Sequence, residues 1–152
     1  LLEAVIEVNE KQKLRVIEKL EKFLGDLKDK TIGVLGLSFK PNTSDVRESP
    51  ALSIIPVLLE KGAKVKVYDP VAMEEFKIAA KGLNIEYASD PLNCAAETHG
   101  LVLLTEWNEF RFLNLSQLKK VMKNPLIIDM RNIYEPSVVK SLGFSYEGIG
   151  RL

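Results

Sequence analysis

Residues 31–50 read Thr31-Ile-Gly-Val-Leu-Gly-Leu-Ser-Phe-Lys-Pro-Asn-Thr-Ser-Asp-Val-Arg-Glu-Ser-Pro50. The stretch begins as a short apolar run and changes at Ser38 into a polar loop that carries Lys40 and Arg47. A new apolar-periodic segment opens at Pro50, so the order predicts a strand, a loop and a helix. Parallel sheets bind ligands beyond the carboxyl ends of their strands. The loop therefore places cations where an anionic ligand would lie.

Outside this stretch, short apolar runs alternate with amphipathic segments. The predicted strands are Thr31–Leu37, Lys64–Tyr68, Ile85–Ala88, Leu101–Thr105, Leu126–Met130 and Phe144–Ile149. The predicted helices are Pro50–Lys61, Val71–Lys81, Pro91–Thr98, Ser116–Lys123 and Pro136–Leu142. Strict alternation favours a parallel sheet with helices on both faces. We predict an α/β fold with a Rossmann-like doubly wound parallel sheet of about six strands, preceded by a long N-terminal helix.

That N-terminal helix is predicted over residues 1–25. Its apolar positions recur at three- and four-residue spacing: Leu14, Ile17, Leu20 and Leu24. Two interpretations of the apolar face stay open, docking against a preceding domain or second subunit, and packing on the chain's own sheet. Four glycines stand where we expect helices to end, a position that tolerates left-handed backbone: Gly62, Gly82, Gly100 and Gly143.

Composition bounds the class of protein. The chain has 152 residues, with 21 Lys+Arg against 21 Asp+Glu, so it lacks the basic excess of a nucleic-acid binder. No apolar run approaches the roughly 18 residues that a bilayer crossing needs, which argues against a membrane partner. A single cysteine, Cys94, fits a reducing compartment, and we expect a cytoplasmic protein. The start at Leu1 without Met suggests a piece of something longer.

Cations follow several predicted strands, and in a parallel sheet these strand ends share one edge. We expect Lys40, Arg47 and Arg131 to converge there and to suit a diphosphate, each contact contributing about 1.5–3 kcal/mol. Arg131 offers a bidentate grip that a lysine lacks. The alternative is that these cations form ordinary salt bridges with nearby acids: Asp45, Glu48, Glu106 or Asp129.

A dinucleotide site is only weakly indicated. Gly33 and Gly36 do not form the Gly-x-Gly-x-x-Gly fingerprint, and Asp69 lies further from them than the about 20 residues expected of a ribose-binding acid. Phe39 and Trp107 suit either base stacking or packing at the edge.

Catalytic and metal sites are not indicated. Cys94 and His99 lack further ligands nearby, so no metal site is expected. We interpret Cys94 as helix packing and His99 as a capping or surface residue. No nucleophile and base can be paired, and no catalytic residue is predicted.

Several motifs together resemble one family. The segment from Gly36 to Pro50, Gly62-Ala with Val67-Tyr-Asp-Pro70, Leu104-Thr-Glu-Trp107, Ile128-Asp-Met-Arg-Asn132 and a closing Gly148-Ile-Gly150 occur in order. This series closely resembles the C-terminal domain of the UDP-glucose/GDP-mannose dehydrogenase family, and it covers essentially the whole chain. The segment around Val8-Asn9 is similar to the long helix that joins the two halves of that family.

The resemblance implies an enzyme that oxidises the C6 hydroxyl of a nucleotide sugar to a carboxylate with two NAD, in the service of polysaccharide biosynthesis. It implies that residues 28–152 are a UDP-sugar-binding Rossmann-like domain and that residues 1–27 belong to a central connecting and dimerisation helix. By matching positions, Phe39, Lys40 and Arg131 would bind the UDP-sugar and Arg47 would reach NAD. NAD itself would bind mainly to an N-terminal domain, and the parent would be a homodimer.

The chain also departs from that family. The Gly-Gly-x-Cys-x-Pro-Lys-Asp segment with the catalytic cysteine is absent, Cys94 does not match it, and the N-terminal Gly-x-Gly-x-x-Gly is missing. We therefore expect an excised domain that is inactive without its N-terminal and central partners. Asp129-Met-Arg-Asn132 favours UDP-glucose. The alternatives are the same domain of a UDP-N-acetylmannosamine or GDP-mannose dehydrogenase, a free-standing nucleotide-binding module, and a purely structural dimerisation domain.

Overall fold

The structure, a computed structural model, describes residues 2–149, without the side chains of residues 2–9 and 12. Gly150, which closes the last motif, lies outside the described residues. The strands are β1 Thr31–Leu35, β2 Lys64–Tyr68, β3 Glu86–Tyr87, β4 Gly100–Leu103, β5 Leu126–Asp129 and β6 Ser145–Gly148. The helices are α1 Leu2–Leu24, α2 Ala51–Glu60, α3 Met73–Ala79, α4 Pro91–Ala95, α5 Asn108–Arg111, α6 Leu115–Val121 and α7 Pro136–Ser141.

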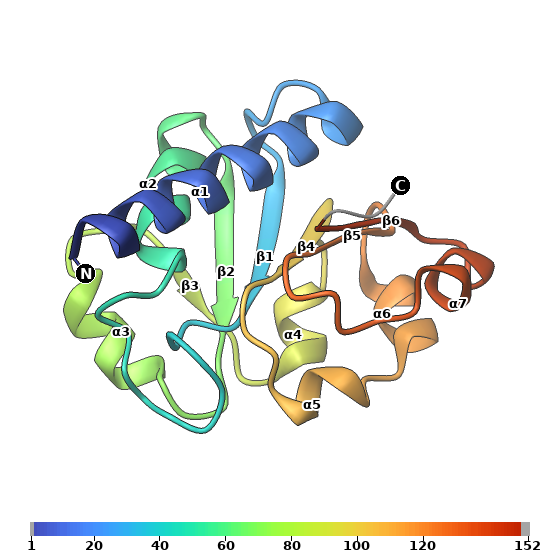
Figure 1. The fold of residues 1–152 in the computed structure, drawn as a ribbon. Coiled ribbons are helices and arrows are strands. Elements are labelled where there is room, and N and C mark those ends of the chain that lie inside the picture. The colour runs from blue at the N-terminus through green and yellow to red at the C-terminus, as the bar shows by residue number, and fades with distance from the viewer. Residues whose placement is uncertain (1, 150–152) are drawn as a thin grey trace.

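The strands form one six-stranded sheet in the order β3-β2-β1-β4-β5-β6 (Figure 1). Every neighbouring pair is parallel. This is the strand order of the Rossmann fold, in which the chain leaves the sheet centre in one direction and then in the other. The predicted fold class is confirmed, including helices on both faces of the sheet.

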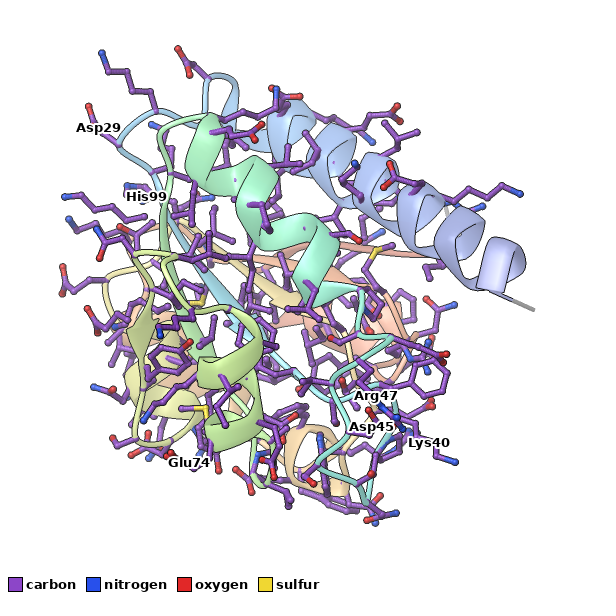
Figure 2. The ribbon with its side chains drawn as sticks, turned by 90° about the vertical axis from the view of Figure 1, so that its left-hand side faces the viewer. Asp29, Lys40, Asp45, Arg47, Glu74 and His99 are labelled. Carbon is purple, nitrogen blue, oxygen red and sulfur yellow. The ribbon has the colours of Figure 1, made fainter. Side chains whose placement is uncertain are left out.

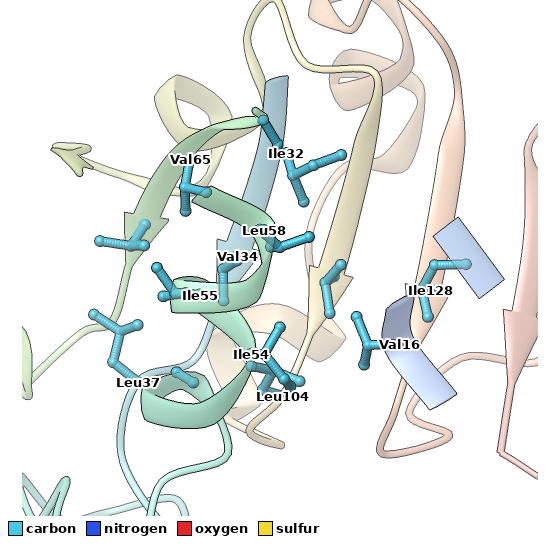
Figure 3. Close-up of a cluster of buried hydrophobic side chains, with 14 of the residues drawn as sticks. Val16, Ile32, Val34, Leu37, Ile54, Ile55, Leu58, Val65, Leu104 and Ile128 are labelled. Carbon is cyan, nitrogen blue, oxygen red and sulfur yellow. The ribbon is translucent and has the colours of Figure 1, made fainter. Parts of the chain in front are cut away.

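Two hydrophobic clusters show how the helices divide between the faces. Along β4, Val102 belongs to the cluster that contains α1, α2 and α3, whereas Leu101 and Leu103 belong to the cluster that contains α4 to α7. This alternation follows from the two-residue period of a strand. Figure 3 shows the first cluster, where α2 lays Ile54 and Leu58 over the central strands. Helices therefore cover both faces of the sheet, and the central strands are buried from solvent.

Helix α1 packs on its own sheet. Val16 and Leu20 are fully buried in the first cluster, and the helix contacts α2 and β5. Leu14, which shares the apolar periodicity of the helix, lies off the sheet, with its side chain 57% exposed. Gly100 was wrongly placed at a helix end: it is the first residue of β4, where a Cβ would lie 3.4 Å from Leu20 Cδ2. The missing side chain at Gly100 lets α1 approach the sheet.

Element boundaries differ in two informative places. Strand β1 ends at Leu35, earlier than predicted, because Gly36 has a φ of 104° that turns the chain out of the sheet. The four-residue helix α5 was not predicted. It is too short to give a period of its own, and only Phe110 is buried in it.

Candidate functional site

The loop after β1 lies at the carboxyl edge of the sheet, as predicted. Figure 2 shows Lys40, Asp45 and Arg47 together at one end of the molecule, with His99 and Asp29 near the opposite end. Phe39 is 41% exposed and Lys40 is also exposed, so both side chains are available to a ligand. The lone histidine therefore takes no part in this site.

The first turn of the loop is tightly built against β4. A Cβ on Gly36 would lie 2.6 Å from the backbone nitrogen of Thr105, so no side chain fits there. The Thr105 hydroxyl donates to the carbonyl of Ser38 at 2.9 Å, and the amide of Phe39 donates to the carbonyl of Asp45 at 2.7 Å. These contacts hold the backbone that carries Phe39 and Lys40.

Asp69 directly follows β2 and is a buried carboxylate to which several donors point. Its side chain is 1% exposed. Oδ2 accepts from the backbone N–H groups of Leu37 at 2.8 Å and Ser38 at 3.1 Å, and from Nε1 of Trp107 at 3.1 Å. Oδ1 accepts from the amides of Val71 at 2.9 Å and Ala72 at 2.8 Å. The ribose-binding interpretation of Asp69 is therefore excluded by geometry, and Trp107 packs at the edge with its indole N–H engaged.

Asp129 plays a similar part at the end of β5 and sets the turn that carries Arg131. Its carboxylate, fully buried, accepts from the amides of Arg131 at 3.1 Å and Ile133 at 2.9 Å. The Tyr146 hydroxyl donates to Asp129 at 2.7 Å. Asn132 adopts a φ of 54° and exchanges two hydrogen bonds with the backbone of Ile149. The Asp-Met-Arg-Asn turn is thus anchored to the end of β6.

Arg131 forms a salt bridge across the edge to Glu106, which follows β4. Its guanidinium Nη2 lies 3.2 Å from Glu106 Oε1, and the two side chains are 30% and 37% exposed. Partly exposed pairs of this kind contribute about 0–1 kcal/mol. A phosphate that accepts two hydrogen bonds from Arg131 is therefore able to displace Glu106.

Arg47 is paired within its own loop. Its Nε and Nη2 donate to the two carboxylate oxygens of Asp45 at 3.1 Å and 2.8 Å. The hydrogen bond from Arg47 lowers the pKa of Asp45 from 3.8 to about 2, and the same contact raises the pKa of Arg47. Both groups are solvent-exposed, so the pair leaves Arg47 free to reorient toward another anion.

Lys40 differs from the two arginines. Among residues 2–149 it forms no salt bridge, although its charge helps to lower the pKa of Asp45. Beside it lies a hollow of about 210 Å³ between the loop and the end of β4, lined by Pro41, Asn42, Glu106, Asn108 and Arg111. The salt-bridge alternative thus holds for Arg47 and Arg131, whereas Lys40 has no ion-pair partner within the part of the chain that the structure describes.

The remaining chemistry-bearing residues are structural. Cys94 is buried, and its burial raises the pKa of the thiol to about 12, so it is not a nucleophile. His99 is partly exposed and satisfies the backbone at the start of β1: its Nδ1 accepts from the amide of Thr31 at 3.0 Å, and desolvation lowers its pKa. Within the described residues no cluster of His, Cys, Asp and Glu could hold a metal ion. None of the described helices has the length and apolar character needed to cross a bilayer.

Sequence reasoning missed how much of this edge depends on buried carboxylates. Asp69 and Asp129 both directly end an apolar strand and precede a sharp turn, and that position was the available signal. Tyr146 was not singled out, because its partner Asp129 lies on another strand.

Fold and site define a Rossmann-type domain whose carboxyl edge is equipped for an anionic ligand. A family model, the UDP binding domain of the UDP-glucose/GDP-mannose dehydrogenase family, matches residues 33–136. The chain belongs to the UDP-glucose/GDP-mannose dehydrogenase family.

Individual relatives support the same placement. Over 151 residues the chain is 45% identical to the UDP-glucose 6-dehydrogenase TuaD of Bacillus subtilis, covering 99% of this chain and 32% of the relative. A UDP-glucose dehydrogenase structure from Pyrobaculum islandicum superposes with a TM-score of 0.81 at 34% identity, covering 99% of this chain and 32% of that one. A UDP-D-ManNAc dehydrogenase from Pyrococcus horikoshii gives a TM-score of 0.70 at 30% identity, covering 90% and 29%. The chain spans about a third of the length of the curated relatives that it matches.

Proposed function

We propose that this chain binds the UDP part of a nucleotide sugar at the carboxyl edge of its sheet. Phe39 and Lys40 on the loop after β1, together with Arg131 after β5, form the binding surface. The observation that carries the proposal is the placement of Arg131: its backbone amide is held by the Asp129 turn, and its guanidinium pairs with the partly exposed Glu106. The held backbone places the guanidinium at the carboxyl edge, where its salt bridge to Glu106 is weak enough for a diphosphate to compete with it.

We further propose that the chain serves a UDP-glucose 6-dehydrogenase that uses NAD. Relatives of that name support this substrate. In such an enzyme the remote grip on the diphosphate would hold the sugar near the nicotinamide, which is how non-reacting contacts raise the rate. Arg47, exposed and paired only within its loop, would turn toward NAD bound by another domain. This chain contributes no catalytic residue of its own.

The setting of the domain follows the same proposal. Residues 28–152 would form the nucleotide-binding domain, and residues 1–27 would continue into a central helix where a homodimer forms. The exposed Leu14 on that helix fits a contact with further protein. The free, buried Cys94 is compatible with a cytoplasmic, reducing location.

Calorimetric titration of the chain with UDP, UDP-glucose and GDP tests the proposal. We expect UDP and UDP-glucose to bind and Arg131→Ala to weaken both by about ten- to a hundredfold, the loss of one charge-assisted contact. Lys61→Ala is the matched control, because it removes one positive charge just before β2, at the opposite edge of the sheet, where Lys61 pairs with Glu21.

Each outcome separates the alternatives. Tighter binding of GDP than of UDP would move the substrate toward GDP-mannose. An equal loss in Lys61→Ala and Arg131→Ala would show that general charge, and not the edge, attracts the nucleotide. No binding of any nucleotide would contradict the proposal for this chain and favour a structural role.

A further inference from the structure

The turn after β1 differs from a dinucleotide-binding turn in what its amides contact. In the Rossmann fold the backbone N–H groups after the first strand point at a bound phosphate, and an acid at the end of the second strand binds ribose. Here the amides of Leu37 and Ser38 donate instead to the carboxylate of Asp69, at 2.8 Å and 3.1 Å. The acid thus accepts from amides of the turn where a bound phosphate would accept in a dinucleotide-binding domain.

We propose that Asp69 is a positioning residue, an internal anion that replaces a bound phosphate and fixes the loop carrying Phe39 and Lys40. This inference rests on the proposed function for its ligand, because the loop is taken to bind a nucleoside diphosphate. Asp69 itself touches no ligand: its side chain is 1% exposed, and both oxygens are filled by donors from the chain.

Asp69 joins three strand ends at once. Through Leu37 and Ser38 it holds the turn after β1, through Ala72 the turn after its own strand, and through Trp107 the segment after β4. Hydrogen bonds to a charged group are the stronger kind, each contributing about 1.5–3 kcal/mol. A single carboxylate therefore sets the relative positions of the segments that flank the ligand edge.

Ser38 connects Asp69 to Lys40 through hydrogen bonds. The Ser38 hydroxyl lies 2.9 Å from the carbonyl of Lys40 and 3.3 Å from Asp69 Oδ2. A hydroxyl has one proton to donate, so Ser38 engages one of these acceptors at a time while its amide stays on Asp69. Loss of the carboxylate would free the Ser38 backbone and with it the position of the neighbouring Phe39 and Lys40.

The internal anion also has a consequence for ligand choice. Because the Leu37 and Ser38 amides are occupied and a negative charge already lies against them, a pyrophosphate cannot use this turn as it would in a dinucleotide-binding domain. A nucleoside diphosphate must instead be held by side chains beyond the turn, which are Lys40 and Arg131. The domain thus keeps the Rossmann strand order, but its proposed anion site lies at Lys40 and Arg131 and not at the backbone amides of the turn after β1.

Three measurements on Asp69→Asn test the proposal. We expect amide hydrogen exchange at Leu37 and Ser38 to accelerate at least tenfold, because a neutral carboxamide is a weaker acceptor than the carboxylate oxygen that both amides use. UDP affinity measured by calorimetry should fall at least tenfold. In the full-length enzyme, the KM for UDP-glucose should rise at least tenfold with kcat changed less than threefold, a split that general loss of structure would not give.

Asp90→Asn is the matched control. Asp90 caps the N-terminus of α4; within the described residues its side-chain hydrogen bonds are with the Asn93 amide at 2.7 Å and the Ser89 hydroxyl at 3.3 Å, neither of them on the loop after β1. We expect it to leave exchange at Leu37 and Ser38 and the UDP affinity within twofold of the unsubstituted chain. Formate added to Asp69→Ala should restore both properties, and chloride at the same concentration should not.

Ser38→Ala is a second variant that keeps the test decisive if Asp69→Asn does not fold. It removes only the hydroxyl that reaches Lys40, and it should weaken UDP binding while the melting temperature stays within a few degrees. Unchanged exchange in Asp69→Asn, or faster exchange with unchanged UDP affinity and KM, would overturn the inference. If the unsubstituted chain binds no UDP, the proposed function fails separately, and amide exchange alone then decides whether Asp69 orders the loop.

Discussion

At the scale of single residues, carboxylates organise the site and cations complete it. Asp69 and Asp129 are buried and accept backbone amides, so each fixes a turn. The cations stand on those turns: Lys40 follows the first, and Arg131 belongs to the second. Buried acids with several donors are rigid, whereas exposed cations keep the freedom to meet a ligand.

The exposed pair of Asp45 and Arg47 gives a prediction for pH dependence. Contact with Arg47 depresses the folded-state pKa of Asp45 from 3.8 to about 2. A depressed carboxyl pKa contributes stability that is present above the unfolded value and is lost as pH falls through about 2. Carbon-13 NMR titration of the Asp45 carboxyl should therefore give a midpoint near 2.

The same titration in variants isolates the cause. Arg47→Gln should return the midpoint toward 3.8, and Lys40→Gln should move it much less, because Lys40 acts only through its distant charge. A midpoint that does not move in Arg47→Gln would show that the pair does not form in solution.

Much of the candidate site was predictable at this scale, and the reason is chain order. Lys40, Arg47 and Arg131 each follow a strand, and parallel strands bring such residues to one edge without further information. Their partners were not predictable. Whether Arg131 meets Glu106 or Asp129 depends on side-chain rotamers and on the buried donors that already fill Asp129. The sequence alone does not show which of these carboxylates is already occupied by other donors.

At the scale of elements, helix α1 is a long helix of which only the C-terminal part is shown to pack on the sheet. Val16 and Leu20 are fully buried, but Leu14 is 57% exposed. The three- and four-residue spacing located the helix correctly, but it could not say which of the apolar positions face the sheet. Which positions face the sheet depends on where the helix crosses it, and Gly100 opens that crossing.

The difference between Leu14 and Leu20 predicts unequal stability losses. Leu20→Ala leaves a cavity between α1 and the sheet and should cost about 2–5 kcal/mol of unfolding free energy. Leu14→Ala removes the same atoms from a largely exposed site and should stay within about 0.5 kcal/mol. Urea denaturation followed by circular dichroism measures both, and equal losses would contradict the packing of α1 described above.

Gly36 and Gly82 both have positive φ angles, and comparing alanine substitutions at the two positions separates backbone strain from steric crowding. Gly82 has a φ of 94° with no atom near its absent Cβ, whereas at Gly36 a Cβ would meet Thr105 at 2.6 Å. We expect Gly82→Ala to cost about 1–2 kcal/mol from backbone strain alone. Gly36→Ala should cost clearly more and also weaken UDP binding, because the turn after β1 must move.

Denaturation and calorimetry on this pair of glycine variants measure the two effects. A Gly36→Ala chain as stable as Gly82→Ala would mean that Thr105 yields, and the tight first turn would then not be a requirement of the site.

At the scale of the whole molecule, α1 completes the helical layer on one face of the sheet, where α2 and α3 leave β5 uncovered. Helices α2 and α3 share one face of the sheet with α1, and α4 to α7 lie on the other. The face of β5 that carries Ile128 is covered by α1 through Val16, as Figure 3 shows. The C-terminal part of the proposed connecting helix, with Val16 and Leu20, is therefore part of the folded core of this domain.

A truncation at the proposed boundary tests this dependence. A chain of residues 28–152 uncovers Ile128 and Val102, and we expect its urea midpoint to fall well below that of residues 1–152. A chain of residues 13–152 keeps Val16 and Leu20 and should retain a midpoint close to the parent. If residues 28–152 were as stable as the parent, α1 would be an attachment and not a structural layer.

Because Cys94 is buried, the reactivity of its thiol can be used to measure how often the native structure opens. The thiol belongs to α4 and lies against the sheet, 3.7 Å from the carbonyl of Val34 in β1 and 3.5 Å from that of Lys66 in β2. With a pKa near 12 and no exposure, it stays silent toward thiol reagents until the sheet parts. The rate of labelling therefore reports how often the buried thiol becomes exposed to solvent. A fluorophore on a cysteine introduced elsewhere at the surface would attach selectively, with the native residue left in place.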